Sequence, residues 1–265
     1  MSATPLIDGE SDGAGDVPAE HGPGVNVYEK MSAETSLAKA QLVIRRIIAS
    51  RDDRASLVTQ IAIEVGGEII EEVLAPGHDL NSVDLAKRYR TSRTPIREAL
   101  MLLEKEGLVD VPPRRRPRVM VLDLPTIAEI YRTRATLLEL GAADVANSAS
   151  EAEISALEAQ VEKMAQACAA EDLRAYLWYN IEFHDLNLIA SRNQTAKRIV
   201  ESLLLRTIQL RRRSLFAPGR MARSLEDHRR LVQAYGNRDA NLAGALIRSN
   251  HMHALQNIQR QQNTD

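Results

Sequence analysis

Apolar residues recur three or four positions apart over most of the chain, which is the spacing of amphipathic helices. The first half shows this spacing over 34–50 and over 55–74, and Pro76-Gly77 ends the second segment. In the second half the predicted helices are 124–147, 151–169, 172–190, 194–213, 223–236 and 239–261. This pattern predicts an antiparallel bundle of six or seven helices over 123–265.

Two shorter helices and two strands are predicted between these regions. One helix begins at Asn81 or Ser82 and the next at Ser92, all residue types that cap helix N-termini. Residues 108–111 and 119–122 then alternate apolar and polar positions, as strands do. Helix, short helix, turn, helix and two-stranded wing is the order of a winged helix-turn-helix. We therefore expect a mostly α protein with a small wing.

Local sequence also predicts where some helices begin. Ser150 with Glu153 and Ser224 with Asp227 resemble capping boxes, in which two side chains satisfy free backbone groups at a helix start. The helix at 34–50 precedes the winged unit, and its role stays open at this stage. It can pack on that unit or cross to a partner subunit.

Composition then narrows the class of protein. The chain has 265 residues, of which 44% are hydrophobic, and a single cysteine, so a disulfide scaffold is excluded. Apolar runs are too short to span a bilayer, and the N-terminus shows no signal-peptide pattern. We expect a cytoplasmic protein without membrane contact. Its predicted parts are a disordered acidic tail at 1–33, a winged helix-turn-helix with an extra N-terminal helix at 34–122, and the bundle at 123–265.

The net charge of −2 hides a segregated distribution. Residues 1–40 hold seven acidic and two basic side chains, a net charge of −5. Residues 87–118 hold ten basic and four acidic side chains, a net charge of +6. A basic segment over the predicted winged unit favours a nucleic-acid partner, although charge runs are usually solvated faces.

The chemistry of this segment suits double-stranded DNA. Arg93 and Arg97 lie four residues apart on one helix face, and both reach guanine edges or phosphates in a recognition helix. Ser92 and Thr94 are candidate phosphate donors. The wing adds candidate backbone contacts at Arg114, Arg115, Arg116 and Arg118.

The same residues carry a resemblance to a known family. Asp84-Leu85-Ala86, Ser92-Arg93-Thr94-Pro95-Ile96-Arg97-Glu98-Ala99-Leu100 and Leu103-Glu104-Lys105-Glu106-Gly107-Leu108-Val109 resemble the winged-helix signature of GntR-type bacterial transcription regulators. The resemblance implies that Arg93, Thr94 and Arg97 contact DNA. Two positions depart from it. Val83 stands where some members have a DNA-contacting arginine, and Arg114 stands where the wing tip is often glycine.

The second half resembles the helical FCD effector domain of the FadR subgroup. The resemblance rests on Tyr131-x-x-Arg134, Glu139-Leu140-x-Ala142-Ala143, Phe183-His184, Asn193, Asp227-His228 and Asp239. It implies a homodimer that binds a small organic acid, often through a divalent metal (Zn, Ni or Mn) held by an aspartate and three histidines. His184 and His228 match two of these ligands, Asn180 stands at the aspartate position, and Asn250, with His251 beside it, stands at the third histidine.

These positions leave two interpretations open. His184 and His228 bind a metal, with Asn180 and with Asn250 or His251, or they are core histidines that hydrogen-bond the effector directly. Arg134 matches a family arginine that faces the carboxylate of the ligand. The alternative role for Arg134 is a structural salt bridge within the protein. The predicted effector site is Arg134, Asn180, His184, His228 and Asn250.

The resulting expectation is a regulator, with repression as the default, whose affinity for operator DNA changes when a small carboxylate binds. A metal-dependent hydrolase in the helical half is one alternative, but the sequence holds no H-E-x-x-H, nucleophile elbow or phosphate loop, so we expect no enzyme. A ligand-independent architectural DNA-binding protein is the other alternative.

Overall fold

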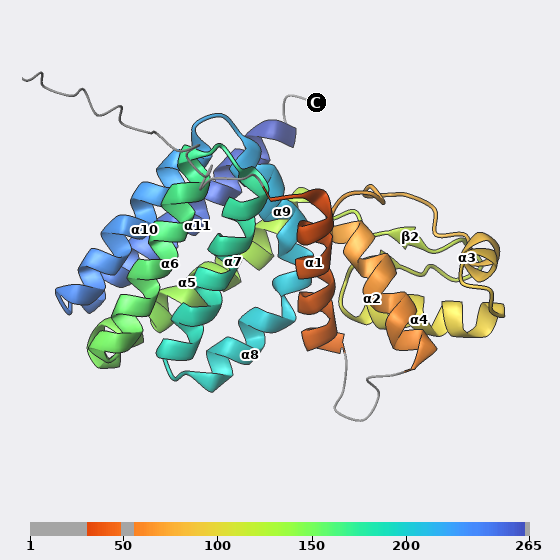
Figure 1. The fold of residues 1–265 in the computed structure, drawn as a ribbon, viewed down its shortest axis with the longest axis horizontal. Helices are drawn as coiled ribbons and strands as arrows, with labels where there is room; N and C mark the ends of the chain where they lie inside the picture. Colours follow the sequence, from red (N-terminus) through yellow and green to blue (C-terminus); the bar gives the residue numbers. More distant parts are fainter. Residues whose placement is uncertain (1–30, 49–55, 263–265) are drawn as a thin grey trace, which may run out of the picture.

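The computed structural model describes residues 31–48 and 56–262, so nearly all of the predicted tail at 1–33 lies outside the described residues. Eleven helices and two short strands make up this part of the chain (Figure 1). They are α1 (Ala33–Ile48), α2 (Leu57–Ile70), α3 (Ser82–Arg88), α4 (Arg93–Lys105), β1 (Val109–Asp110), β2 (Arg118–Val119), α5 (Leu124–Ser148), α6 (Glu151–Ala169), α7 (Leu173–Ala190), α8 (Gln194–Ser202), α9 (Leu204–Phe216), α10 (Arg220–Gly236) and α11 (Ala240–Gln262). The predicted fold class, mostly α with a two-stranded wing, is confirmed.

The N-terminal unit consists of α2, α3, α4, β1 and β2. Asn81 accepts a hydrogen bond from the Val83 amide and so caps α3, as predicted. The strands β1 and β2 pair antiparallel, with Val109 opposite Val119. They are shorter than the predicted 108–111 and 119–122. The loop at 77–80 contributes backbone hydrogen bonds to the other side of β2, a pairing that sequence alternation did not indicate.

The bundle consists of α5 to α11, and α5 packs along much of α11. Six of its seven helices begin within three residues of a predicted start, but the predicted helix at 194–213 is wrong. It divides at Leu203, which ends α8 and begins α9. No glycine or proline marks this division. It lets Val200 before the turn and Leu204 and Leu205 after it all reach the core.

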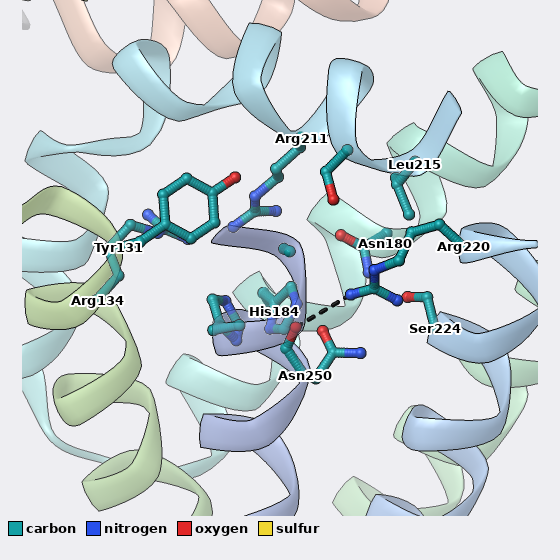
Figure 2. Close-up of a pocket in the computed structure, with 12 residues that line it drawn as sticks. Tyr131, Arg134, Asn180, His184, Arg211, Leu215, Arg220, Ser224 and Asn250 are labelled. Carbon is teal, nitrogen blue, oxygen red and sulfur yellow. Dashed lines mark hydrogen bonds between the residues drawn. The ribbon is translucent and has the colours of Figure 1, made fainter. Parts of the chain in front are cut away.

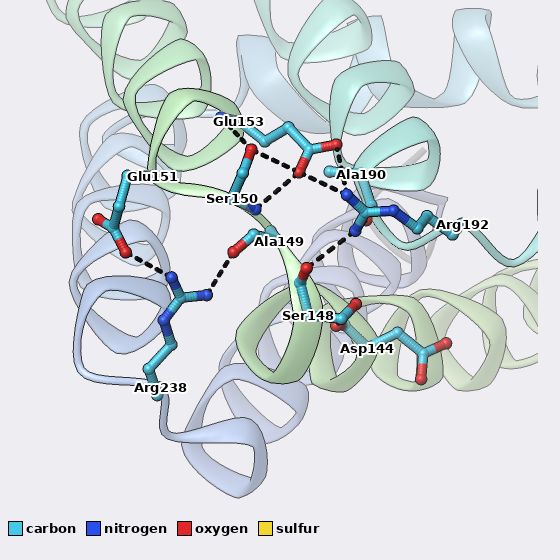
Figure 3. Close-up of polar contacts among 9 residues, drawn as sticks. All are labelled: Asp144, Ser148, Ala149, Ser150, Glu151, Glu153, Ala190, Arg192 and Arg238. Carbon is cyan, nitrogen blue, oxygen red and sulfur yellow. Dashed lines mark hydrogen bonds and ion pairs between the residues drawn. The ribbon is translucent and has the colours of Figure 1, made fainter.

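One of the two predicted capping boxes is present. Ser150 and Glu153 make both reciprocal hydrogen bonds at the start of α6. Arg192 donates to Ser148 and pairs with Glu153, so the turn between α5 and α6 is fixed from the side of α7 (Figure 3). The box predicted at Ser224 is wrong, because α10 already begins at Arg220 and buries Ser224 inside its second turn.

Helix α1 lies between the N-terminal unit and the bundle of the same chain (Figure 1). It packs closely on α2, where a side chain at Gly66 would lie 2.9 Å from Ile44. On the other side it meets α7: Trp178 Nε1 donates to Ser36 Oγ at 2.8 Å, and Lys39 pairs with Glu182. The open question about this helix is therefore answered for one chain, since it joins the two parts.

Helix α9 contacts the N-terminal unit directly. Arg212 and Glu71 form a buried ion pair with a 2.9 Å N–O separation, without the alignment of a hydrogen bond. Gln209 donates to the Ile69 carbonyl, and the Arg206 side chain covers Gly107. Residues 206, 209 and 212 thus form one face of α9 that packs on this unit. No helix in the described part of the chain is long and apolar enough to cross a membrane.

Candidate functional site

The outer face of α4 presents the residues predicted to contact DNA. Ile96, Ala99, Leu100 and Leu103 are buried and fix the rotation of the helix. Arg93, Thr94 and Arg97 are consequently exposed. Ser92 begins the helix, but its side chain makes no capping hydrogen bond, so its hydroxyl stays available to a ligand.

The wing lies beside this face. Arg114, Arg115 and Arg116 are exposed in the loop between β1 and β2. Arg114 has a φ of 62°, a left-handed conformation that glycine adopts with less strain than arginine. Arg118 pairs with Asp79 at 2.9 Å, so its guanidinium is already engaged.

One open groove of about 680 Å³ connects these parts. It is lined by the start of α3, by Arg93 and Arg97 of α4, and by residues 111–117 of the wing. Val83, which departs from the resemblance noted above, is 41% exposed in this groove. The groove presents guanidinium groups and a helix N-terminus, both suited to an anionic backbone.

A second candidate site is a cavity inside the bundle (Figure 2). Four of the five predicted effector residues line it, namely Arg134, Asn180, His184 and Asn250. His228 lies behind them and contacts Asn180 through Nε2 at 3.3 Å. Sequence reasoning missed Tyr131, Arg211 and Arg220, which also line the cavity. The run Arg211-Arg212-Arg213 in an otherwise amphipathic helix was an available signal, because three consecutive residues spread over about 200° of the helix surface and so extend toward its packed side.

Three histidines gather at this cavity. The ring centroid of His184 lies 5.4 Å from that of His228 and 5.0 Å from that of His251. His228 Nδ1 donates to the Ser224 carbonyl, and His251 Nδ1 donates to the Ile247 carbonyl. These hydrogen bonds fix the tautomers and leave each Nε2 as an acceptor.

Burial controls the charges in this region. Desolvation lowers the pKa of His228 to about 4, and it holds the pKa of His184 and His251 well below the usual histidine value. All three are therefore neutral at pH 7. Desolvation also lowers the pKa of Arg211 to about 10, so this side chain stays protonated.

Arg134 is buried and has no acidic partner among the described residues. Its Nη1 donates to the Val200 carbonyl at 3.1 Å, and the pKa of its guanidinium is lowered by burial and by nearby Arg211. The salt-bridge alternative therefore finds no carboxylate in this part of the chain. Arg134 instead faces the cavity (Figure 2).

The donor set does not fit a divalent metal. The Asn180 amide donates to His228 Nε2, which occupies the lone pair that a metal would use. The Asn250 amide donates to Asp227 at 2.9 Å. Within the described residues, no group of three or more His, Cys, Asp and Glu side chains is arranged to hold a metal ion. Three guanidinium groups line the same cavity and repel a cation.

Two family descriptions match the chain. "Bacterial regulatory proteins, gntR family" matches residues 57–119, and "FCD domain" matches residues 129–254. The uncharacterized HTH-type transcriptional regulator YdhC of Bacillus subtilis is 31% identical over 187 residues, 69% of this chain and 83% of the relative. The gluconate operon transcriptional repressor of the same organism is 25% identical over 205 residues, 75% of this chain and 82% of the relative.

Solved structures show the same fold. Escherichia coli McbR/YncC superimposes with a TM-score of 0.65 at 22% identity, covering 78% of this chain and 99% of that one. A transcriptional regulator GntR from Rhodococcus sp. RHA1 superimposes with a TM-score of 0.65 at 20% identity, covering 77% and 97%.

Proposed function

The chain belongs to the GntR family of bacterial regulatory proteins, with an FCD domain, and from this we propose that it binds operator DNA as a homodimer and responds to a small carboxylate. The family and its relatives are DNA-binding transcription regulators, not enzymes. Repression is the proposed outcome, supported by the relative that represses a gluconate operon. Operator binding would place the protein in the cytoplasm with the chromosome.

The groove on the N-terminal unit supports the proposed DNA contacts. With α4 in the major groove, Arg93 and Arg97 reach base edges, while Ser92 and Thr94 reach phosphates. The exposed wing arginines at 114–116 follow the backbone or enter the minor groove, and Arg118 contributes from its pair with Asp79. Two copies in a homodimer place two such helices on successive half-sites.

The observation that carries effector control is the double role of α9. One face of this helix brings Arg211 to the cavity, and residues 206, 209 and 212 hold the N-terminal unit. A carboxylate among Arg134, Asn180, His184, His228 and Asn250 therefore binds against a helix that touches the DNA-binding part. An effector that favours one position of α9 changes the orientation of that part, and hence operator affinity.

A mobility-shift titration on DNA upstream of the protein's own gene tests this function. We expect Arg97→Ala to weaken specific binding by about 1–3 kcal/mol if Arg97 reads a base pair. Arg230→Ala, which removes an exposed arginine from α10, is the matched control and should bind normally. If Arg97→Ala loses as much affinity for random DNA as for the specific site, Arg97 contacts only phosphates.

Two further measurements separate the alternatives. Replacing Arg114, Arg115 and Arg116 by glutamine should reduce the salt slope of log K by about 0.9 for each lost phosphate contact. An unchanged salt slope would mean that the wing does not contact the DNA. If added carboxylates release the DNA, the protein is an effector-responsive regulator. If DNA affinity is the same with every acid tested, the ligand-independent architectural protein is favoured.

A further inference from the structure

Three arginine side chains enter the bundle cavity, and no acidic side chain lines it. Arg134, Arg211 and Arg220 are 1%, 7% and 4% exposed. They come from three different helices, α5, α9 and α10. Figure 2 shows the guanidinium groups of Arg211 and Arg220 directed toward one central space, with Arg134 behind the Tyr131 ring. Burying this much like charge is unfavourable unless an anion compensates it.

The protein satisfies only part of this donor set. Arg134 donates to the Val200 carbonyl, and Arg220 Nη2 donates to the Asn250 carbonyl at 3.0 Å. Both terminal nitrogens of Arg211 have no hydrogen-bond partner in the protein, and neither do Arg220 Nε and Nη1. The Tyr131 and Ser214 hydroxyls, also buried in the lining, are likewise without a partner. Guanidinium groups only donate, so the cavity calls for a ligand rich in acceptors.

We propose that this cavity binds a compact anion carrying two negative charges, without a metal, and that Arg211 and Arg220 supply the positive charge that holds it. This rests on the proposed function in one respect, because it names the class of effector. The proposal excludes the alternative in which His184 and His228 bind a metal.

The charge balance selects a dianion. The three guanidinium groups carry three positive charges, and the neighbouring Asp227 carboxylate, which acts electrostatically on Arg220, offsets one of them. Arg223 acts on Arg220 in the opposite sense, but it is exposed and therefore screened by solvent. The cavity histidines are neutral and add none. A monocarboxylate would leave one buried charge uncompensated, whereas a dicarboxylate or a hydrogen phosphate brings the sum to zero.

The size of the cavity selects a compact ligand. The space beside Arg211 measures about 30 Å³, and a second space of about 20 Å³ shares Arg134, His184 and Arg211 as a common wall. Each holds one or two water molecules. A bound anion therefore displaces part of this wall, and the second space gives the Arg211 side chain room to move. A three-carbon dicarboxylate or inorganic phosphate meets both limits.

Thermal unfolding of the full chain tests this in a buffer with EDTA and constant ionic strength. The probes are malonate and inorganic phosphate as dianions and acetate as the single carboxylate. We expect malonate, phosphate or both to raise the Tm by about 5 °C or more near saturation, and acetate to raise it by less than about 1 °C. Which dianion acts distinguishes a dicarboxylate from a phosphate ligand.

Variants make the test specific to the site. Arg211→Gln should raise the Tm of the anion-free protein, because it removes an unpaired buried charge, and should abolish the anion-induced shift. Arg213→Gln, an identical change two residues along α9 and outside the cavity lining, should keep the shift. Arg211→Lys should retain part of it, because the charge remains.

Three results overturn the proposal. The first is a Tm that neither dianion raises. The second is a Tm increase that requires Zn, Ni or Mn in place of EDTA. The third is a Tm increase that persists in Arg211→Gln and so reflects a general salt effect. DNA binding is measured separately on the same preparations. Operator binding without an anion-induced shift rejects the ligand class alone. An anion-induced shift that leaves operator affinity unchanged rejects effector control but keeps the site.

Discussion

The buried ion pair between Glu71 and Arg212 should hold the N-terminal unit on the bundle. Its side chains are 5% and 6% exposed, and Ser36 Oγ donates to the same Glu71 carboxylate at 2.8 Å. Charge centres about 4 Å apart attract by about 4 kcal/mol at an effective dielectric constant of about 20. Removing one partner leaves the other charge buried and alone, which costs about 3–5 kcal/mol.

A double-mutant cycle measures this contribution. We expect Glu71→Gln and Arg212→Met each to lower the free energy of unfolding by about 3 kcal/mol. The double variant should lose much less than their sum, since no charge is left unpaired. Urea unfolding is followed by far-UV circular dichroism and by fluorescence of Trp178, the single tryptophan, which hydrogen-bonds Ser36 beside the pair.

An exposed ion pair across the same junction is the control. Arg46 and Asp185 are 44% and 25% exposed, so Asp185→Asn should cost less than about 1 kcal/mol. The reasoning is refuted if Glu71→Gln and Arg212→Met each cost less than about 1 kcal/mol, or if their effects add fully in the double variant. Either result would mean that α9 holds the N-terminal unit by apolar packing alone.

Three further predictions follow from the same structure. Burial depresses the folded-state pKa of His184, His228 and His251 below the unfolded value of 6.5, so the unfolded chain binds more protons below that pH. Stability should therefore be full only well above pH 6.5 and fall by about 1 kcal/mol per histidine between pH 7 and pH 5.5. Urea unfolding at constant salt that shows no such loss would contradict their burial. Gly107→Ala should lower the free energy of unfolding by about 1–2 kcal/mol, because Gly107 has a φ of 74° and lies under Arg206; an unchanged Tm would mean that this loop relaxes freely. Arg114→Gly should stabilise the protein by about 0.5 kcal/mol by relieving its positive φ, while reducing the salt slope of DNA binding, and a lower Tm would show that the wing needs the arginine side chain.

Local signals in the sequence were enough to predict the position of most helices. The spacing of apolar residues predicted the bundle helices, and Ser92 and Asn81 marked the starts of α4 and α3 correctly, since these patterns depend on neighbours within one or two turns. The division at Leu203 had no such signal, because it depends on which core positions Val200 and Leu204 reach after folding. Ser224 failed as a cap for a similar reason, since the preceding turn at Gly219 had already started the helix.

The sequence by itself determined the winged unit, the helical bundle and the family, because contiguous motifs and local periodicity carry that information. The resemblance also grouped Arg134, Asn180, His184, His228 and Asn250. All of these except His228 line one cavity, and their role in effector binding stays a prediction. Only the tertiary structure decided that Arg211 and Arg220 join them, that His251 faces His184, and that α1 joins the two parts of one chain. The physical reason is that these contacts connect residues distant in sequence, and the rotation of each helix about its axis is set by packing against the others.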